Sequence, residues 1–149
     1  MSQETETPLP NSTPPVADPA RARTRAIVGA SALALAVPGL VLLFASAEVS
    51  PVFFGIALPE SATALVAAAW LALASMNWLA RHSILGGIYG RPVVAANQVH
   101  FTIGALVLVR TVLRSGGSSA LWALTGVYVA FALYFNALLY GPGLTRRDR

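Results

Sequence analysis

The sequence contains no cysteine and no lysine, and it has few charges. Without cysteine the 149-residue chain forms no disulfide, zinc-thiolate site, c-type haem attachment or dithiol relay. All ten basic residues are arginine, which excludes a lysine Schiff base with retinal or a pyridoxal cofactor. Charged residues make up only 11% of the chain and hydrophobic residues 56%, with a mean hydropathy of +0.65. This balance is not typical of a soluble domain.

The sixteen charges are also unevenly placed. From Arg25 onward they leave four uncharged stretches, at 26–47, 61–80, 92–109 and 115–145. At 1.5 Å per residue, each stretch is long enough to cross a hydrocarbon core roughly 30 Å thick as a helix. The sequence therefore predicts an all-α protein, a four-transmembrane-helix bundle of up-down-up-down topology. Its helices are expected at about 26–47, 61–80, 92–113 and 120–140.

The remaining segments are short or polar. Residues 1–20 are rich in proline, serine and threonine, which predicts a disordered tail before a bundle at 21–145. Residues 146–149 are a basic C-terminal tail. The segment 48–60 contains two prolines and an apolar run too short to span, so we expect it at the membrane interface. Pro38-Gly39 predicts a kink in the first helix.

The arginines indicate an orientation. Eight of the ten lie before the first span, between the second and third, or after the fourth, and only Arg110 and Arg114 lie on the other side. Cytoplasmic loops carry the excess of arginine. The bias predicts a multi-pass protein of the plasma membrane, the inner membrane in a bacterium, with both termini in the cytoplasm. The net charge of +4 then reflects orientation, and we expect a lipid bilayer and no nucleic acid as partner.

An alternative applies to the first helix. Three arginines within 21–25, an apolar run and then Ala45-Ser46-Ala47 resemble the parts of a cleaved signal peptide. Cleavage after Ala47 would give a mature chain that begins at Glu48. The apolar run is longer than the 7–15 residues usual in signal peptides, which favours a retained helix.

Four polar side chains inside the spans form the first candidate site. Asn77, Asn97, His100 and Asn136 all fall in the predicted cytoplasmic half of the bundle. An unpaired polar group is costly in hydrocarbon, so these residues predict either a ligand-binding pocket or a set of mutual hydrogen bonds that fixes helix register. In a pocket, His100 could relay a proton, ligate a haem or bind the polar end of a ligand.

The loop between the second and third spans is the second candidate. It contains Arg81, Gly86, Gly87, Gly90 and Arg91, whose amides and guanidinium groups could hold a lipid headgroup or another anion. The spacing matches neither a Walker loop nor a dinucleotide fingerprint. A tight turn flanked by cytoplasmic arginines explains the same residues, and that alternative stays open.

The stretch from Met76 to Arg110 carries a resemblance. Its N-W-x-x-R and G-G-I-Y-G-R-P motifs resemble the core of small bacterial four-helix integral membrane proteins of unknown function. The resemblance implies the helix count and draws attention to the motif residues, which are Asn77, Arg81, Tyr89, Gly90, Arg91, Asn97 and His100. DoxX-like bundles are similar in size and helix number. Neither comparison implies a mechanism.

Known four-helix chemistries lack their residues here. A small multidrug exporter needs a carboxylate within a span, a quinone-linked thiol oxidoreductase needs cysteines, and an intramembrane serine protease needs a nucleophile motif beside its histidine. We therefore expect no enzymatic activity, no cofactor and no metal site. The sequence predicts a scaffold or accessory subunit that packs through small-residue helix faces, as a homo-oligomer or in a larger membrane complex. Ala64, Ala68 and Ala72 form such a face. The alternative is a binder or carrier of a small apolar ligand, a lipid or quinone, that uses the asparagine and histidine pocket.

Overall fold

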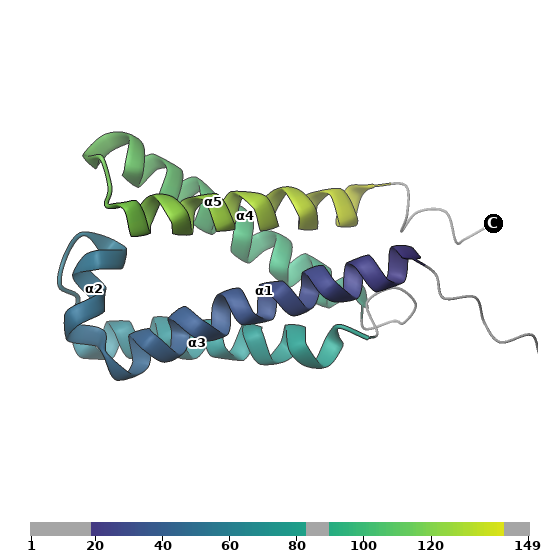
Figure 1. The fold of residues 1–149 in the computed structure, drawn as a ribbon, viewed down its shortest axis with the longest axis horizontal. Helices are drawn as coiled ribbons and strands as arrows, with labels where there is room; N and C mark the ends of the chain where they lie inside the picture. The colour runs from purple at the N-terminus through teal and green to yellow at the C-terminus, as the bar shows by residue number, and fades with distance from the viewer. Residues whose placement is uncertain (1–18, 83–89, 142–149) are drawn as a thin grey trace, which may run out of the picture.

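The computed structural model describes residues 19–82 and 90–141, which form five helices and no strand within those ranges (Figure 1). The helices are α1 (Pro19–Phe44), α2 (Ser46–Phe54), α3 (Glu60–Ala80), α4 (Gly90–Ser115) and α5 (Ser119–Tyr140). All but α2 are long and apolar enough to cross a membrane. The prediction of an all-helical bundle is confirmed, and the chain is a multi-pass membrane protein. Residues 1–18 of the predicted tail and the basic tail at 146–149 lie outside the described residues.

The first helix begins earlier than predicted. It starts at Pro19 instead of residue 26 and includes three exposed arginines, at 21, 23 and 25. Hydropathy marks only the apolar part of a helix, whereas arginine is a good helix former and proline is favoured at the first helical position. The helix continues through Pro38 and ends at Phe44, three residues before the predicted end.

The segment predicted to lie at the interface contains a short helix. Helix α2 covers nine residues and is followed by Gly55, whose φ of 72° favours glycine. Two serine hydroxyl groups form hydrogen bonds that connect α2 to the residues after it and to the start of α5. The buried Ser50 Oγ accepts a hydrogen bond from the Leu58 amide at 3.4 Å, and Ser118 Oγ donates one to the Val52 carbonyl at 3.2 Å. Helix α2 is thereby held against the start of α5.

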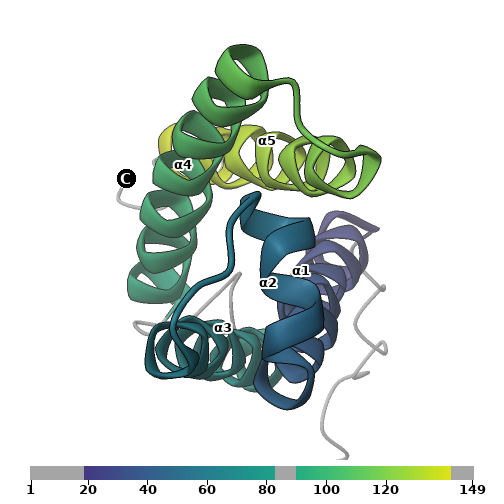
Figure 2. The same cartoon turned by 90° about the vertical axis from the view of Figure 1, so that its left-hand side faces the viewer.

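The long helices form two pairs. Helix α1 packs chiefly on α3 and α4 chiefly on α5, with fewer contacts between the pairs (Figures 1 and 2). In Figure 1 successive long helices run in opposite directions. Helix α4 starts beside the end of α3 and then diverges from it, as Figure 2 shows. The two pairs therefore meet closely at one end only.

The inward face of α3 is formed by residues other than Ala64, Ala68 and Ala72. Its buried residues are Thr63, Ala67, Trp70, Ala74 and Asn77, which recur every three or four positions. Opposite this face, the buried Gly39 lets α1 approach closely, because a Cβ there would lie 3.2 Å from Leu71 Cγ.

The alanine row predicted as a packing face lies outside this contact. Ala68 and Ala72 are exposed, and Ala64 is half-buried. Asn77 is polar and Trp70 is large, and both are buried on the inward side of α3. Their burial determines which side of the helix faces inward, so the alanine row is turned away from it.

Two asparagine side chains join the helix pairs. Asn77 Nδ2 donates to Asn97 Oδ1 at 2.7 Å, and Asn97 Nδ2 donates back to Asn77 Oδ1 at 2.6 Å. Their second N–H groups bind Ser31 Oγ on α1 and the Val93 carbonyl on α4, at 3.1 and 2.8 Å. Both asparagines are fully buried. Every amide hydrogen of this pair has a partner, so these two residues form mutual hydrogen bonds of the kind that the predicted alternative describes.

Replacing one asparagine is expected to cost more than replacing both. In Asn77→Leu the Asn97 amide is left buried without its partner, and we expect a loss of about 1–3 kcal/mol in the free energy of unfolding. In the double variant Asn77→Leu/Asn97→Leu neither side chain is left unpaired, and part of that loss should be recovered. Reversible unfolding in mixed micelles measures both values. A double variant that loses more free energy of unfolding than Asn77→Leu alone would contradict the coupling between the two asparagines.

Candidate functional site: a pocket between the helix pairs

The divergence of α4 from α3 leaves a pocket of about 450 Å³ between the two helix pairs. Helices α2, α3, α4 and α5 all contribute to its wall. The lining residues are Phe53, Phe54, Trp70, Val99, His100, Ile103, Gly104, Val107, Leu108, Thr111, Leu121, Leu124 and Tyr128. These described residues include no acid and no arginine, so the wall is mostly apolar.

A histidine and a tyrosine supply the polar part of the wall. His100 Nε2 lies 3.1 Å from Tyr128 Oη, within hydrogen-bond distance, and the two ring centroids are 5.5 Å apart. Further rings hold the pair in place. Phe101 contacts both rings at centroid distances of 5.2 Å, and the centroid of the Trp70 ring lies 6.5 Å from that of Tyr128. The pair therefore has a fixed position at the end of the pocket nearest to Asn97.

Helix α4 accommodates Tyr128 through a glycine. A Cβ at Gly104 would lie only 2.4 Å from Tyr128 Cε1. The tyrosine ring therefore packs directly on the α4 backbone one turn beyond His100, where any side chain would displace it. The sequence places Gly104 on the same helix face as His100, and the structure gives it this specific role.

Of the four polar residues predicted to share a site, only His100 lines the pocket. Asn77 and Asn97 bind each other. Asn136 forms a separate group, since its Nδ2 donates to Thr102 Oγ1 at 2.8 Å and its Oδ1 accepts from Gln98 Nε2 at 3.2 Å. Successive residues of a helix differ by about 100°, so closely spaced positions on α4 face different neighbours.

The position of the pocket also differs from the predicted one. It extends from His100 toward Phe53 on α2, away from the arginine-rich end, whereas the sequence placed it in the arginine-rich half. The asparagines close that half by bonding across the helix pairs. On the other side of His100 the two helix pairs are farther apart. His100 therefore lies at the boundary between the half that the asparagines close and the pocket.

The predicted anion-binding residues are only partly described. Gly86 and Gly87 lie outside the described residues. Arg81 donates a hydrogen bond to the Trp78 carbonyl, and its guanidinium carbon lies 3.8 Å from the centroid of the Trp78 ring. Gly90 is the buried first residue of α4, and Arg91 is exposed in its first turn, so the helix begins two residues before the predicted start at Pro92. Headgroup binding by this loop stays a prediction.

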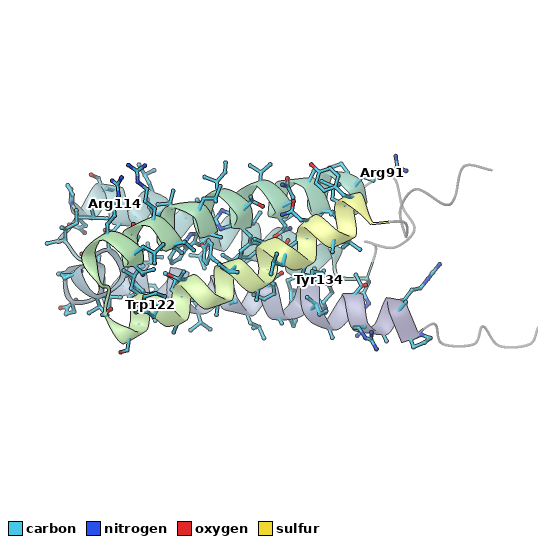
Figure 3. The ribbon with its side chains drawn as sticks, turned by 90° about the horizontal axis from the view of Figure 1, so that it is seen from above. Arg91, Arg114, Trp122 and Tyr134 are labelled. Carbon is cyan, nitrogen blue, oxygen red and sulfur yellow. The ribbon has the colours of Figure 1, made fainter. Side chains whose placement is uncertain are left out.

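The two ends of the bundle carry different charges. Arg91 and Arg114 lie at opposite ends, and Trp122 lies at the Arg114 end (Figure 3). In the described part of the chain, the end with Arg91 also carries arginines 21, 23, 25 and 81, and no acid. The described acids, Glu48 and Glu60, belong to the other end. Desolvation and the nearby charges of Arg25 and Arg81 lower the pKa of His82 at the arginine-rich end.

Sequence reasoning missed both Tyr128 and Trp70 as residues of the pocket wall. Tyr128 lies in the middle of an apolar helix, and its partner His100 is on another helix. The one available signal was the position of Tyr128 far from both helix ends. Tyrosines near helix ends are explained by the membrane interface, but this position is not. Trp70 is buried and forms part of the pocket wall.

No protein-family model, curated protein or solved structure matches this chain. The resemblance of residues 76–110 to small bacterial membrane proteins stays a prediction.

Removing a nearby positive charge should raise the pKa of His82. In Arg25→Gln the imidazolium loses one repulsive neighbour, so its pKa should move up toward the ordinary value of about 6.5. NMR titration of labelled histidine in detergent measures the shift. His100→Gln identifies which of the two histidine signals belongs to His82. An unchanged pKa would show that Arg25 does not act on this ring.

A methyl group at position 104 should displace Tyr128. We expect Gly104→Ala to reduce the free energy of unfolding by about 1–3 kcal/mol, because overpacking forces the ring to shift. Gly126→Ala is the matched control, since a Cβ at that position would meet no neighbouring atom within 4 Å and alanine favours helix. Equal effects of the two substitutions, measured by unfolding in mixed micelles, would contradict the contact.

Proposed function

We propose that this protein binds a small apolar molecule that reaches the pocket sideways from the bilayer. The carrying observation is the pocket itself, with about 450 Å³ of space, an apolar wall and one fixed polar pair. Small-molecule sites commonly have volumes of about 300–1,000 Å³ and combine apolar walls with a few placed polar groups. The predicted alternative of a ligand binder is therefore favoured, with His100 and Tyr128 in place of the four-residue polar pocket.

The rim of the pocket supports access from lipid. Val99, Ile103 and Val107 line it along α4, and each is more than half exposed. In a bilayer these side chains face acyl chains, so a lipid-soluble molecule can reach the pocket without crossing water. The described residues of the wall include no charged side chain, which favours a neutral ligand because an ion there would lack a counter-charge.

The charge distribution supports a location and an orientation. Five described arginines at one end, against Arg110 and Arg114 at the other, agree in direction with the count over the whole sequence. We propose that the arginine-rich end, where α1 begins and α5 ends, faces the cytoplasm in the plasma membrane, or the inner membrane of a bacterium. The pocket then lies in the half of the bilayer away from the cytoplasm.

A scaffold or accessory subunit is the second candidate. Its support is the row of Ala64, Ala68 and Ala72 on α3, in which Ala68 and Ala72 are exposed in the described part of the chain. Small residues at this spacing let a further helix approach closely in lipid. This function predicts a stable complex with a second copy or another membrane protein, and it does not require the pocket.

Filling the pocket separates the two functions. We expect the wild-type protein, purified in mild detergent, to retain a neutral lipophilic molecule of a few hundred daltons, detectable by native mass spectrometry and solvent extraction. Leu108→Phe adds volume inside the pocket and should reduce the retained fraction at least severalfold. Leu106→Phe is the matched control, because Leu106 lies two residues away on α4, is 67% exposed and does not line the pocket.

The possible outcomes differ clearly. Equal retention in both variants would exclude the pocket as the binding site. A protein that carries no small molecule but purifies with a second copy or a partner subunit would support the scaffold function instead.

A further inference from the structure

We infer that the ligand is a planar ring compound with a carbonyl or hydroxyl group, of the quinone or quinol type, whose ring lies at the His100–Tyr128 end of the pocket. This inference rests on the proposed ligand-binding function and specifies the chemical class. It depends on three features of the wall: its distribution of aromatic rings, its hydrogen-bonding pair and its length.

Three of the five aromatic side chains in the pocket wall lie together at the end that also carries the hydrogen-bonded pair, whereas Phe53 and Phe54 lie on α2 toward the other end. His100 and Tyr128 come from α4 and α5, and Trp70 approaches Tyr128 from α3. These rings are tilted against one another by about 50° instead of stacking face to face. Their edges and partial faces suit a further flat ring, because offset and edge-to-face aromatic contacts contribute about 0.5–1.5 kcal/mol beyond burial. A saturated chain at this end would lack that contribution.

The hydrogen-bonded pair can serve either form of such a ring. If His100 donates from Nε2, the Tyr128 hydroxyl is free to donate to a ligand carbonyl. If Tyr128 donates to Nε2, its oxygen can accept from a ligand hydroxyl. A change of imidazole tautomer therefore adapts the same two residues to a quinone or to a quinol. A hydrocarbon would leave this buried group unused.

The rest of the pocket is elongated and apolar, with mainly aliphatic side chains along α4 and α5 and the rings of Phe53 and Phe54 on α2. Along α4 it runs from Val99 to Thr111, a rise of about 18 Å. Between these positions the wall is formed by side chains such as Val107, Leu108 and Leu124. Thr111 Oγ1 donates to the Val107 carbonyl at 2.9 Å, so its hydroxyl bonds to its own helix. A ring at one end with an alkyl or isoprenoid chain along α4 fits this division of the wall.

Tryptophan fluorescence tests the inference directly. In Trp78→Phe/Trp122→Phe the remaining tryptophan, Trp70, lies in the pocket wall. We expect a benzoquinone with a ten-carbon side chain to quench it saturably in detergent. In Trp70→Phe/Trp78→Phe the remaining Trp122 is half exposed and outside the pocket. Its quenching should rise without saturation, because the quinone reaches it only by dissolving in the micelle.

Two substitutions examine the polar pair in the Trp70 reporter protein. His100→Leu removes the hydrogen-bond partner that orients the Tyr128 hydroxyl toward the ligand and should weaken quinone binding about two- to tenfold, the range expected for one hydrogen bond. His100→Gln keeps a donor and an acceptor and should recover part of the affinity. Competition with 1-decanol, which has a chain and a hydroxyl but no ring, should displace the quinone only at much higher concentration.

Each result bears on one of the two proposals. Saturable quenching of Trp70 alone, weakened by His100→Leu, supports the ring class. Identical quenching of Trp70 and Trp122, or displacement by equal concentrations of 1-decanol, overturns it. If Leu108→Phe still releases a co-purified molecule in that case, ligand binding stands and only the ring class fails. If Leu108→Phe releases nothing either, both proposals fail.

Discussion

The reciprocal hydrogen bonds between Asn77 and Asn97 are the constraint on which the rest of this structure depends. Within each helix pair, side-chain packing extends along the whole contact, but between the pairs α3 and α4 touch over a short distance. In lipid, apolar side chains gain little by leaving one apolar neighbour for another, so a fully paired polar contact determines where two helices meet. The hydrogen bond from Asn77 to Ser31 extends the same constraint to α1.

The pocket follows from this attachment at one end. Helix α4 is fixed beside α3 at Asn97 and diverges beyond it, while α2 fills part of the widening space with Phe53 and Phe54. Between these two supports, His100 and Tyr128 remain as a polar pair in an apolar wall. Structure and proposed function are thus connected, because the contact that sets helix register also sets the depth at which the polar pair lies.

The sequence predicted the helices well and the site poorly, for a physical reason. Long uncharged stretches locate membrane-crossing helices without knowledge of their neighbours, and the described ends differ from the predicted ones by a few residues, apart from the start of α1. Short α2 was not predicted as a helix, because two prolines and seven apolar residues give no clear period. The partner of each polar residue depends on how helices are rotated. The sequence could not predict the contact between Tyr128 and His100, because this contact depends on the space that Gly104 leaves for the tyrosine ring.

The pairing of sequence neighbours has a consequence for how the chain is made. Because α1 packs on α3 and α4 on α5, each pair is a hairpin formed by consecutive membrane segments. The first hairpin can bury its contact while the second is still being synthesised, since chains emerge from the N-terminus onward. Before α4 is inserted, the side-chain amide of Asn77 has only Ser31 of these two partners, because its other partner, Asn97, lies on α4. Insertion of α4 therefore completes a polar contact that the first half of the protein leaves open.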